Sequence, residues 1–145
     1  MRILGIDYGD RKIGLAVSDE LKLTAQALET YRRKNQKEDK EYFKKLVSRY
    51  EIEEIVVGLP LRMDGSPGTR ATKTREFARW LKAVLNLPVL FFDERLTTQQ
   101  AIKILHHHKG NPKVKKDLED QISAVIILMA YLESKRVKSD AGQSR

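Results

Sequence analysis

Residues 3–17 read ILGIDYGDRKIGLAV, and this stretch decides how the fold begins. Residues 3–6 and 13–17 are short apolar runs typical of β-strands, and the four residues 8–11 between them have the composition of a turn. Gly9 can adopt the positive φ that tight turns often require. The sequence therefore predicts a β-hairpin with Asp7 at the end of its first strand.

A third antiparallel strand is expected at residues 24–31, after which helices and strands alternate. Apolar residues at helical spacing indicate helices, and short continuous apolar runs indicate buried parallel strands. The expected helices lie at residues 42–50, 77–85, 98–105 (capped by Thr97 or Thr98) and about 119–135, and the expected parallel strands at residues 55–58 and 89–92. Three antiparallel strands followed by two parallel strands predict an α/β fold, with a mixed sheet covered by helices on both faces. This order of elements is the ribonuclease H-like layout.

The length of 145 residues fits one domain, expected at residues 1–136, followed by a disordered basic tail at residues 137–145. Lys and Arg number 28 against 20 Asp and Glu, and this net charge of +8 favours nucleic acid as a partner. The absence of cysteine excludes disulfides and Cys-containing zinc sites and suits a cytoplasmic protein. The longest strongly apolar stretch, residues 122–132, is shorter than the roughly 20 residues that a membrane span needs, so no membrane association is expected.

Acidic residues lie at the ends of three apolar runs: Asp7 and Glu94 follow expected strands, and Asp120 begins the last helix. Ligands of α/β sheets bind beyond the carboxyl ends of the strands. Because side chains alternate along an extended segment, only one of Asp93 and Glu94 should face such a site. We assign Glu94 to the site and expect Asp93 to hold the following loop or an arginine.

Carboxylates gathered in this way are suitable ligands for Mg²⁺ or Mn²⁺. Two such ions activate water and stabilise the leaving oxygen of a phosphodiester. We therefore expect Asp7, Glu94 and Asp120 to be the metal ligands and catalytic residues of a nuclease. The alternative interpretations are a turn-capping role for Asp7 and ordinary helix-start roles for Glu94 and Asp120.

Basic side chains near these acids are candidates for contacts with nucleic acid, and the long loop at residues 59–71 suits a mobile lid. The candidates are Lys12, Arg62, Arg70, Arg95, Lys113, Lys115 and Lys116. For Lys12 and the lysines after residue 112, solvated surface positions are the alternative. Three consecutive histidines, His106, His107 and His108, point about 100° apart in a helix, so they are not expected to close on one metal ion.

These motifs give the chain a resemblance to the YqgF/RuvX family, ribonuclease H-like proteins described as Holliday junction resolvases and as nucleases acting on the precursor of small-subunit ribosomal RNA. The resemblance covers residues 2–134. It rests on GIDYG and KIGLAV within residues 5–17, VGLPL at 57–61 with MDG at 63–65, DERLTT at 93–98, and Asp120 with SAVIIL at 123–128. It implies a divalent-metal site of Asp7, Glu94 and Asp120. Arg62 stands where the family usually has Asn, and Gln121 where Ser is frequent, so the departures concern loop contacts rather than the carboxylates.

The sequence thus favours a metal-dependent endonuclease that hydrolyses phosphodiester bonds in structured nucleic acid, with processing of pre-16S rRNA as the leading activity. The alternatives are a Holliday junction resolvase in DNA recombination and repair and a nucleic-acid-binding regulator with little catalysis. A kinase-like ATPase is disfavoured because one domain leaves no second lobe to enclose ATP. Both a monomer and a homodimer fit the sequence, and a C2 dimer would suit a four-way junction.

Overall fold

The computed structural model describes the backbone of residues 1–96 and 112–143 and the side chains of residues 1–95 and 121–138. Its elements are β1 (Arg2–Asp7), β2 (Lys12–Ser18), β3 (Ala25–Ala27), β4 (Tyr31–Arg32), α1 (Gln36–Tyr50), β5 (Ile52–Leu59), α2 (Thr69–Leu85), β6 (Val89–Asp93), a 3₁₀ turn η1 (Glu94–Leu96) and α4 (Pro112–Gln143). The helix expected at residues 98–105 lies outside the described residues.

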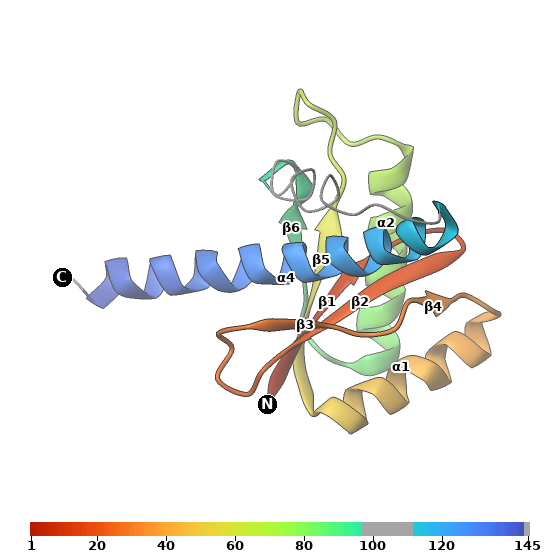
Figure 1. The fold of residues 1–145 in the computed structure, drawn as a ribbon, viewed down its shortest axis with the longest axis horizontal. Helices are drawn as coiled ribbons and strands as arrows, with labels where there is room; N and C mark the ends of the chain where they lie inside the picture. The colour runs from red at the N-terminus through yellow and green to blue at the C-terminus, as the bar shows by residue number, and fades with distance from the viewer. Residues whose placement is uncertain (97–111, 144–145) are drawn as a thin grey trace.

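The strands form one mixed sheet in the order β3-β2-β1-β5-β6, and β4 also pairs with β2 (Figure 1). β1 and β2 form the expected antiparallel hairpin, with Asp7 opposite Gly14. β1 pairs in parallel with β5, and β5 in parallel with β6. The carboxyl ends of three neighbouring strands therefore meet at one edge of the sheet.

The third antiparallel strand is divided into β3 and β4, whereas the sequence predicted one strand at residues 24–31. β3 pairs Ala27 with Ala16, and β4 pairs Tyr31 with Ile13. Between these two pairs the segment advances four residues, from Ala27 to Tyr31, whereas β2 advances three. The segment therefore contains one extra residue, as in a β-bulge. The backbone N–H of Leu28 still donates to the carbonyl oxygen of Leu15 at 2.9 Å, which keeps the segment on the sheet.

Helices cover both faces of the sheet, as predicted. On one face α1 and α2 pack Phe43 and Leu81 against Leu4 and Ile6 of β1. On the other face α4 crosses the strands, with Leu128 fully buried. Gly5 permits this close crossing, because an added Cβ would lie 2.8 Å from the Cβ of Leu128. The apolar surface of α4, which wraps most of the way round, is explained by its position over several strands.

Several expected boundaries and one expected burial differ from the structure. α1 begins at Gln36 rather than at residue 42, and β5 extends over Ile52–Leu59 rather than residues 55–58. β6 is not fully buried: Leu90 and Phe91 are each 43% exposed, because β6 is the last strand at its edge among the described residues. α2 begins at Thr69, well before the apolar pattern that starts at residue 77, since its first turns are largely polar. α4 runs from Pro112 to Gln143 and so continues through most of the segment expected to be a tail. The division of the chain at residue 136 stays a prediction. No helix in the described parts of the chain is long and apolar enough to cross a membrane.

Candidate active site

The candidate site lies where β1, β5 and β6 end. The register pairs Ile6 with Val57 and Leu59 with Asp93, so the last residues of the three strands lie side by side. Odd-numbered residues of β1 face α4, since Ile3 packs in the core beneath α4 and Gly5 lies against Leu128. By the alternation of a strand, Asp7 leaves the sheet on the α4 face.

Gly58 allows the side chain of Glu94 to cross β5. A Cβ built on Gly58 would lie 2.7 Å from Oε1 of Glu94 and 2.5 Å from Cδ1 of Ile127 in α4. The space above Gly58 is therefore filled by the Glu94 side chain, which reaches from the end of β6 to the end of β1. There its carboxyl is hydrogen-bonded with that of Asp7.

This environment changes the acidity of Glu94. Burial raises the pKa of its carboxyl, and the charge of Asp93 raises it further, whereas the hydrogen bond with Asp7 and the charge of Arg70 lower it. A hydrogen bond between two carboxyl groups needs a proton between them. Two carboxylates held this close repel each other when both are ionised, so the pair favours either a bound proton or a bound cation.

Asp120 lies in α4, one turn before Ala124. The carbonyl oxygen of Ala124 lies 3.2 Å from the position that a Cβ on Gly5 would occupy, two residues before Asp7. Gln121, the next residue, shares a cavity with Lys12 at the start of β2, so the helix backbone at residue 120 lies near the β1–β2 turn, while the side chain of Asp120 lies outside the described residues. Among the described residues, which leave that carboxylate out, no three His, Cys, Asp or Glu side chains form a metal-binding group.

Asp93 holds an arginine, one of the two roles expected for it. Nε of Arg95 lies 3.0 Å from both carboxylate oxygens of Asp93, and Nη2 donates to Oδ2 at 2.6 Å. These contacts lower the pKa of the Asp93 carboxyl. Nη1 of Arg95 also reaches the carbonyl oxygen of Met63 at 3.5 Å, so the Asp93–Arg95 pair connects β6 to the loop that follows β5.

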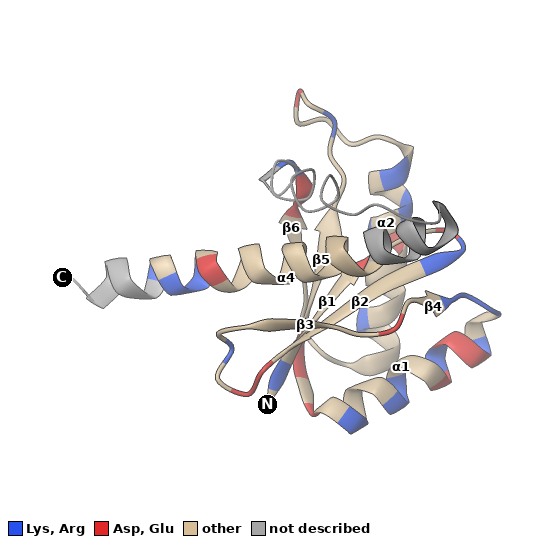
Figure 2. Ribbon diagram, viewed as in Figure 1, with Lys and Arg blue, Asp and Glu red and all other residues tan. Residues whose placement is uncertain are grey.

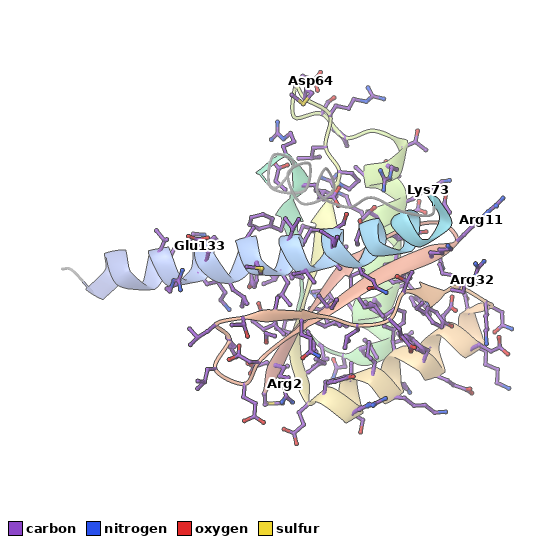
Figure 3. All side chains as sticks on the ribbon, in the orientation of Figure 1. Arg2, Arg11, Arg32, Asp64, Lys73 and Glu133 are labelled. Carbon is purple, nitrogen blue, oxygen red and sulfur yellow. The ribbon has the colours of Figure 1, made fainter. Side chains whose placement is uncertain are left out.

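That loop, residues 60–68, is an internally hydrogen-bonded projection above the sheet edge, with Asp64 near its tip (Figures 1 and 3). The N–H of Gly65 donates to the carbonyl oxygen of Arg62 at 2.8 Å, and Gly65 has the positive φ of 86° that glycine tolerates. Ser66 donates to Oδ1 of Asp64 through both its N–H, at 2.9 Å, and its hydroxyl, at 2.6 Å. The loop expected at residues 59–71 is thus shorter, internally hydrogen-bonded and linked to Arg95, and its role as a mobile lid stays a prediction.

Only some of the basic residues expected to contact nucleic acid have described side chains that lie near the Asp7–Glu94 pair. Lys12 begins β2 and shares a cavity of about 210 Å³ with Thr30, Arg32 and Gln121. Arg70, in the first turn of α2, acts electrostatically on Glu94, and Arg62 lies beside Gly68 just before α2. Figure 2 shows Lys and Arg on the β1–β2 turn, before α1 and at the start of α2. Lys113, Lys115 and Lys116 lie in the first turns of α4, but their side chains are outside the described residues, as are all of His106, His107 and His108.

Two features of the site were not predicted from the sequence. The role of Gly58 depends on which strands are neighbours, although a glycine that ends the apolar run of β5 is a signal of close approach. The second is a network on the other side of the edge, in which Arg33 binds Tyr8 and the buried Asp39. Asp39 is only 1% exposed, and its burial could not be predicted because the residues around it in the sequence are polar.

A sequence model of the family described as "RuvX: Holliday junction resolvase" matches residues 1–134. The chain belongs to the RuvX family. A relative from Halothermothrix orenii is 49% identical over 132 residues, covering 91% of this chain and 94% of that one, and one from Syntrophus aciditrophicus is 44% identical over 144 residues, covering 97% and 96%. Both bear the name "Putative pre-16S rRNA nuclease".

Solved structures support the ribonuclease H-like fold of this RuvX chain. RuvC of T. thermophilus, in complex with a Holliday junction substrate, superposes with a TM-score of 0.59 at 17% identity over 94% of this chain and 96% of that one. A Fowlpox virus resolvase with Holliday junction DNA gives a TM-score of 0.56 at 15% identity over 92% and 98%. At these identities the likeness concerns the fold.

Proposed function

We propose that this protein is a divalent-metal-dependent endonuclease that hydrolyses phosphodiester bonds in structured RNA, and that its substrate is the precursor of 16S rRNA in the cytoplasm. The observation that carries this proposal is the pairing of Asp7 and Glu94 over Gly58 at the carboxyl edge of the sheet. Membership of the RuvX family and the names of the relatives support the same chemistry.

The residues at this edge fit a divalent cation. Two carboxyl groups in hydrogen-bond contact, one with its pKa raised by burial, form a site that loses a proton and gains stability when a hard cation binds. Asp7 and Glu94 would hold Mg²⁺ or Mn²⁺ together with Asp120, and we propose two ions. When bound, the metal supplies Lewis-acid stabilisation of the phosphodiester and a more acidic water.

The chain's own basic groups position the substrate in this proposal. Arg70 lies close enough to Glu94 to lower its pKa, so it also lies close to where a phosphate would sit. Arg62 lies in the loop at residues 60–68 and Arg95 contacts it, and both would contact phosphates next to the one that is cleaved. Lys12, at the start of β2, lies on the other side of β1 and would contact a phosphate there. Arg95 is held by Asp93, which fixes the plane of its guanidinium before substrate arrives.

The test is cleavage by purified protein, with Mg²⁺ or Mn²⁺, of a panel containing precursor 16S rRNA, single-stranded RNA and a four-way DNA junction. We expect endonucleolytic cleavage of the precursor RNA, and loss of cleavage in Asp7→Asn and Glu94→Gln. Glu20→Gln, an exposed acid at the opposite end of β2, is the matched control and should cut normally. Wild-type cleavage rates in Asp7→Asn would contradict the assignment of the site.

The same panel tests the second candidate, which the family description favours. Cleavage of the junction alone, in symmetric positions, would identify a resolvase and would require two sites in a dimer. If the protein bound RNA but did not cleave it with either metal, the protein would be a nucleic-acid-binding protein and the enzymatic proposal would be overturned.

A further inference from the structure

A pocket lies on the face of the sheet opposite to the carboxylates, immediately beyond Asp7. Even-numbered residues of β1 face α1 and α2, and Tyr8 continues this face, packing against Phe77 of α2 with ring centroids 4.8 Å apart. The pocket has a volume of about 330 Å³, within the range of about 300–1,000 Å³ typical of small-molecule sites. Its lining comes from the β1–β2 turn, the start of α1 and one side of α2: Tyr8, Asp10, Arg33, Gln36, Lys73, Glu76, Phe77 and Trp80.

Four of the eight lining residues carry a flat group, and of these Phe77 is buried beneath Arg33, so Tyr8, Trp80 and Arg33 are the ones that can meet a ligand. Trp80 lies 5.9 Å from Phe77 between ring centroids, and the guanidinium carbon of Arg33 lies 5.3 Å from the Tyr8 ring centroid and 5.5 Å from that of Phe77. Arg33 is fixed in this position: Nη1 donates to the Tyr8 hydroxyl at 2.8 Å, and Nε lies 3.5 Å from the buried Asp39 carboxylate. Its side chain is still 25% exposed. Aromatic rings and a fixed guanidinium plane are the surfaces on which proteins stack unpaired bases.

The charges of the pocket favour a base over a phosphate. Arg33 and Lys73 are balanced by Asp10 and Glu76, and Lys73 lies 3.3 Å from Asp10. A phosphate would meet both acids, whereas a base can donate its amino groups to them and exchange hydrogen bonds with Gln36. Figure 3 shows Arg11 at the same end of the molecule as Lys73, and Arg11 is not part of the lining, so it is available outside the pocket for an adjoining phosphate.

We propose that this pocket binds one unpaired nucleobase of the strand that is cleaved, next to the phosphate at Asp7. The proposal rests on the proposed nuclease function, because Tyr8 directly follows Asp7 and the two side chains leave the sheet on opposite faces. A strand with its scissile phosphate at Asp7 passes round the edge of the sheet and inserts a neighbouring base beside Trp80. The site therefore selects substrates with an unpaired base at a fixed distance from the cut.

Trp80 is the only tryptophan of the chain, so its fluorescence reports on this pocket directly. The experiment titrates the protein, in metal-free buffer where no cleavage occurs, with a short single-stranded RNA and with a series in which each position in turn lacks its base. We expect saturable quenching by the complete oligonucleotide and loss of quenching at one abasic position. Equal quenching by every abasic oligonucleotide, or no saturable quenching, would overturn the proposal.

A variant tests the same site without the fluorophore. Trp80→Leu should weaken binding of a dye-labelled oligonucleotide at least about fivefold, the lower limit for loss of one stacked base. Tyr50→Leu is the matched control, since Tyr50 is a half-buried aromatic at the far end of α1, about 21 Å from Gln36 along the helix. Equal affinities in Trp80→Leu and Tyr50→Leu would contradict base binding.

The fluorescence experiment and the nuclease assay can fail independently of each other. Asp7→Asn should lose cleavage and keep the Trp80 quenching and its dependence on one base. Position-specific quenching without any metal-dependent cleavage would retain the pocket and reject the enzyme, whereas cleavage without position-specific quenching would reject the pocket alone.

Discussion

At the residue scale, Gly58 decides whether Asp7 and Glu94 can meet. A methyl group on Gly58 would lie 2.7 Å from Oε1 of Glu94 and 2.5 Å from Cδ1 of Ile127, so both side chains must move. We expect Gly58→Ala to cost about 1–3 kcal/mol of stability, the usual range for overpacking, and to abolish cleavage because Glu94 is displaced. Thermal unfolding and cleavage rates measure both effects.

The matched control is Gly68→Ala in the loop after the same strand. Its backbone has φ of −103°, which any residue adopts, and an added Cβ would meet only the end of the Arg62 side chain. Because Gly68 is the N-cap of α2, where Ala is disfavoured, Gly68→Ala should lose less than about 1 kcal/mol of stability and should cleave at the wild-type rate. Wild-type cleavage by Gly58→Ala would show that Glu94 does not act from its observed position.

Glu94 also gives the metal-free protein a characteristic pH dependence. Burial raises the pKa of its carboxyl above the ordinary value of 4.5, so the folded protein binds this proton more tightly than the unfolded chain. The resulting stability is fully present below pH 4.5 and is lost as pH rises through the raised folded value. We expect the melting temperature of the wild type to fall more over this window than that of Glu94→Gln, which cannot ionise. Parallel curves from melts in metal-free buffer between about pH 4 and pH 7 would contradict the assigned environment.

At the element scale, the Asp93–Arg95 pair should control the loop at residues 60–68. The side chains of Arg95 and Asp93 are 36% and 25% exposed, so water still screens the ion pair, and Asp93→Ala should change the free energy of unfolding by about 1 kcal/mol or less. It should nevertheless release Arg95 from the loop and speed tryptic cleavage after Arg62 several-fold. Asp10→Ala, which removes an exposed ion pair with Lys73, is the control and should leave that rate unchanged. Equal cleavage rates in both variants would mean that the loop is held by its internal hydrogen bonds alone.

The elements also show what the sequence could predict. Short apolar runs identified β1, β2, β5 and β6, and their order predicted the ribonuclease H-like sheet with helices on both faces. Because each apolar run shows where its strand ends, the sequence could predict that Asp7 and Glu94 lie close together at the carboxyl edge of the sheet. The division of the third strand was not, since the extra residue is visible only in the pairing with β2. The start of α2 was not predictable either, because its first turns are largely polar and carry no apolar pattern.

At the scale of the whole molecule, the net charge of +8 should make nucleic-acid binding steeply dependent on salt. We expect the triple change of Lys113, Lys115 and Lys116 to Gln to flatten the slope of log affinity against log salt by about 2–3, one unit or slightly less for each lost phosphate contact. Binding titrations at several salt concentrations measure the slope. The control is the same change at Lys37, Lys44 and Lys45, exposed lysines of α1. A slope equal to that of the wild type would place the binding face away from the start of α4.

The central claim is that Asp7, Glu94 and Asp120 form one metal site, and the most direct test is the rise in melting temperature caused by Mg²⁺ or Mn²⁺. Metal at about 100 times its dissociation constant should stabilise the wild type by about 2.7 kcal/mol. Asp7→Asn, Glu94→Gln and Asp120→Asn should each reduce this increment, and Asp120→Asn should slightly raise the metal-free melting temperature because a like charge is removed. Glu20→Gln should keep the full increment. An equal increment in the wild type and in all three variants would contradict the claim.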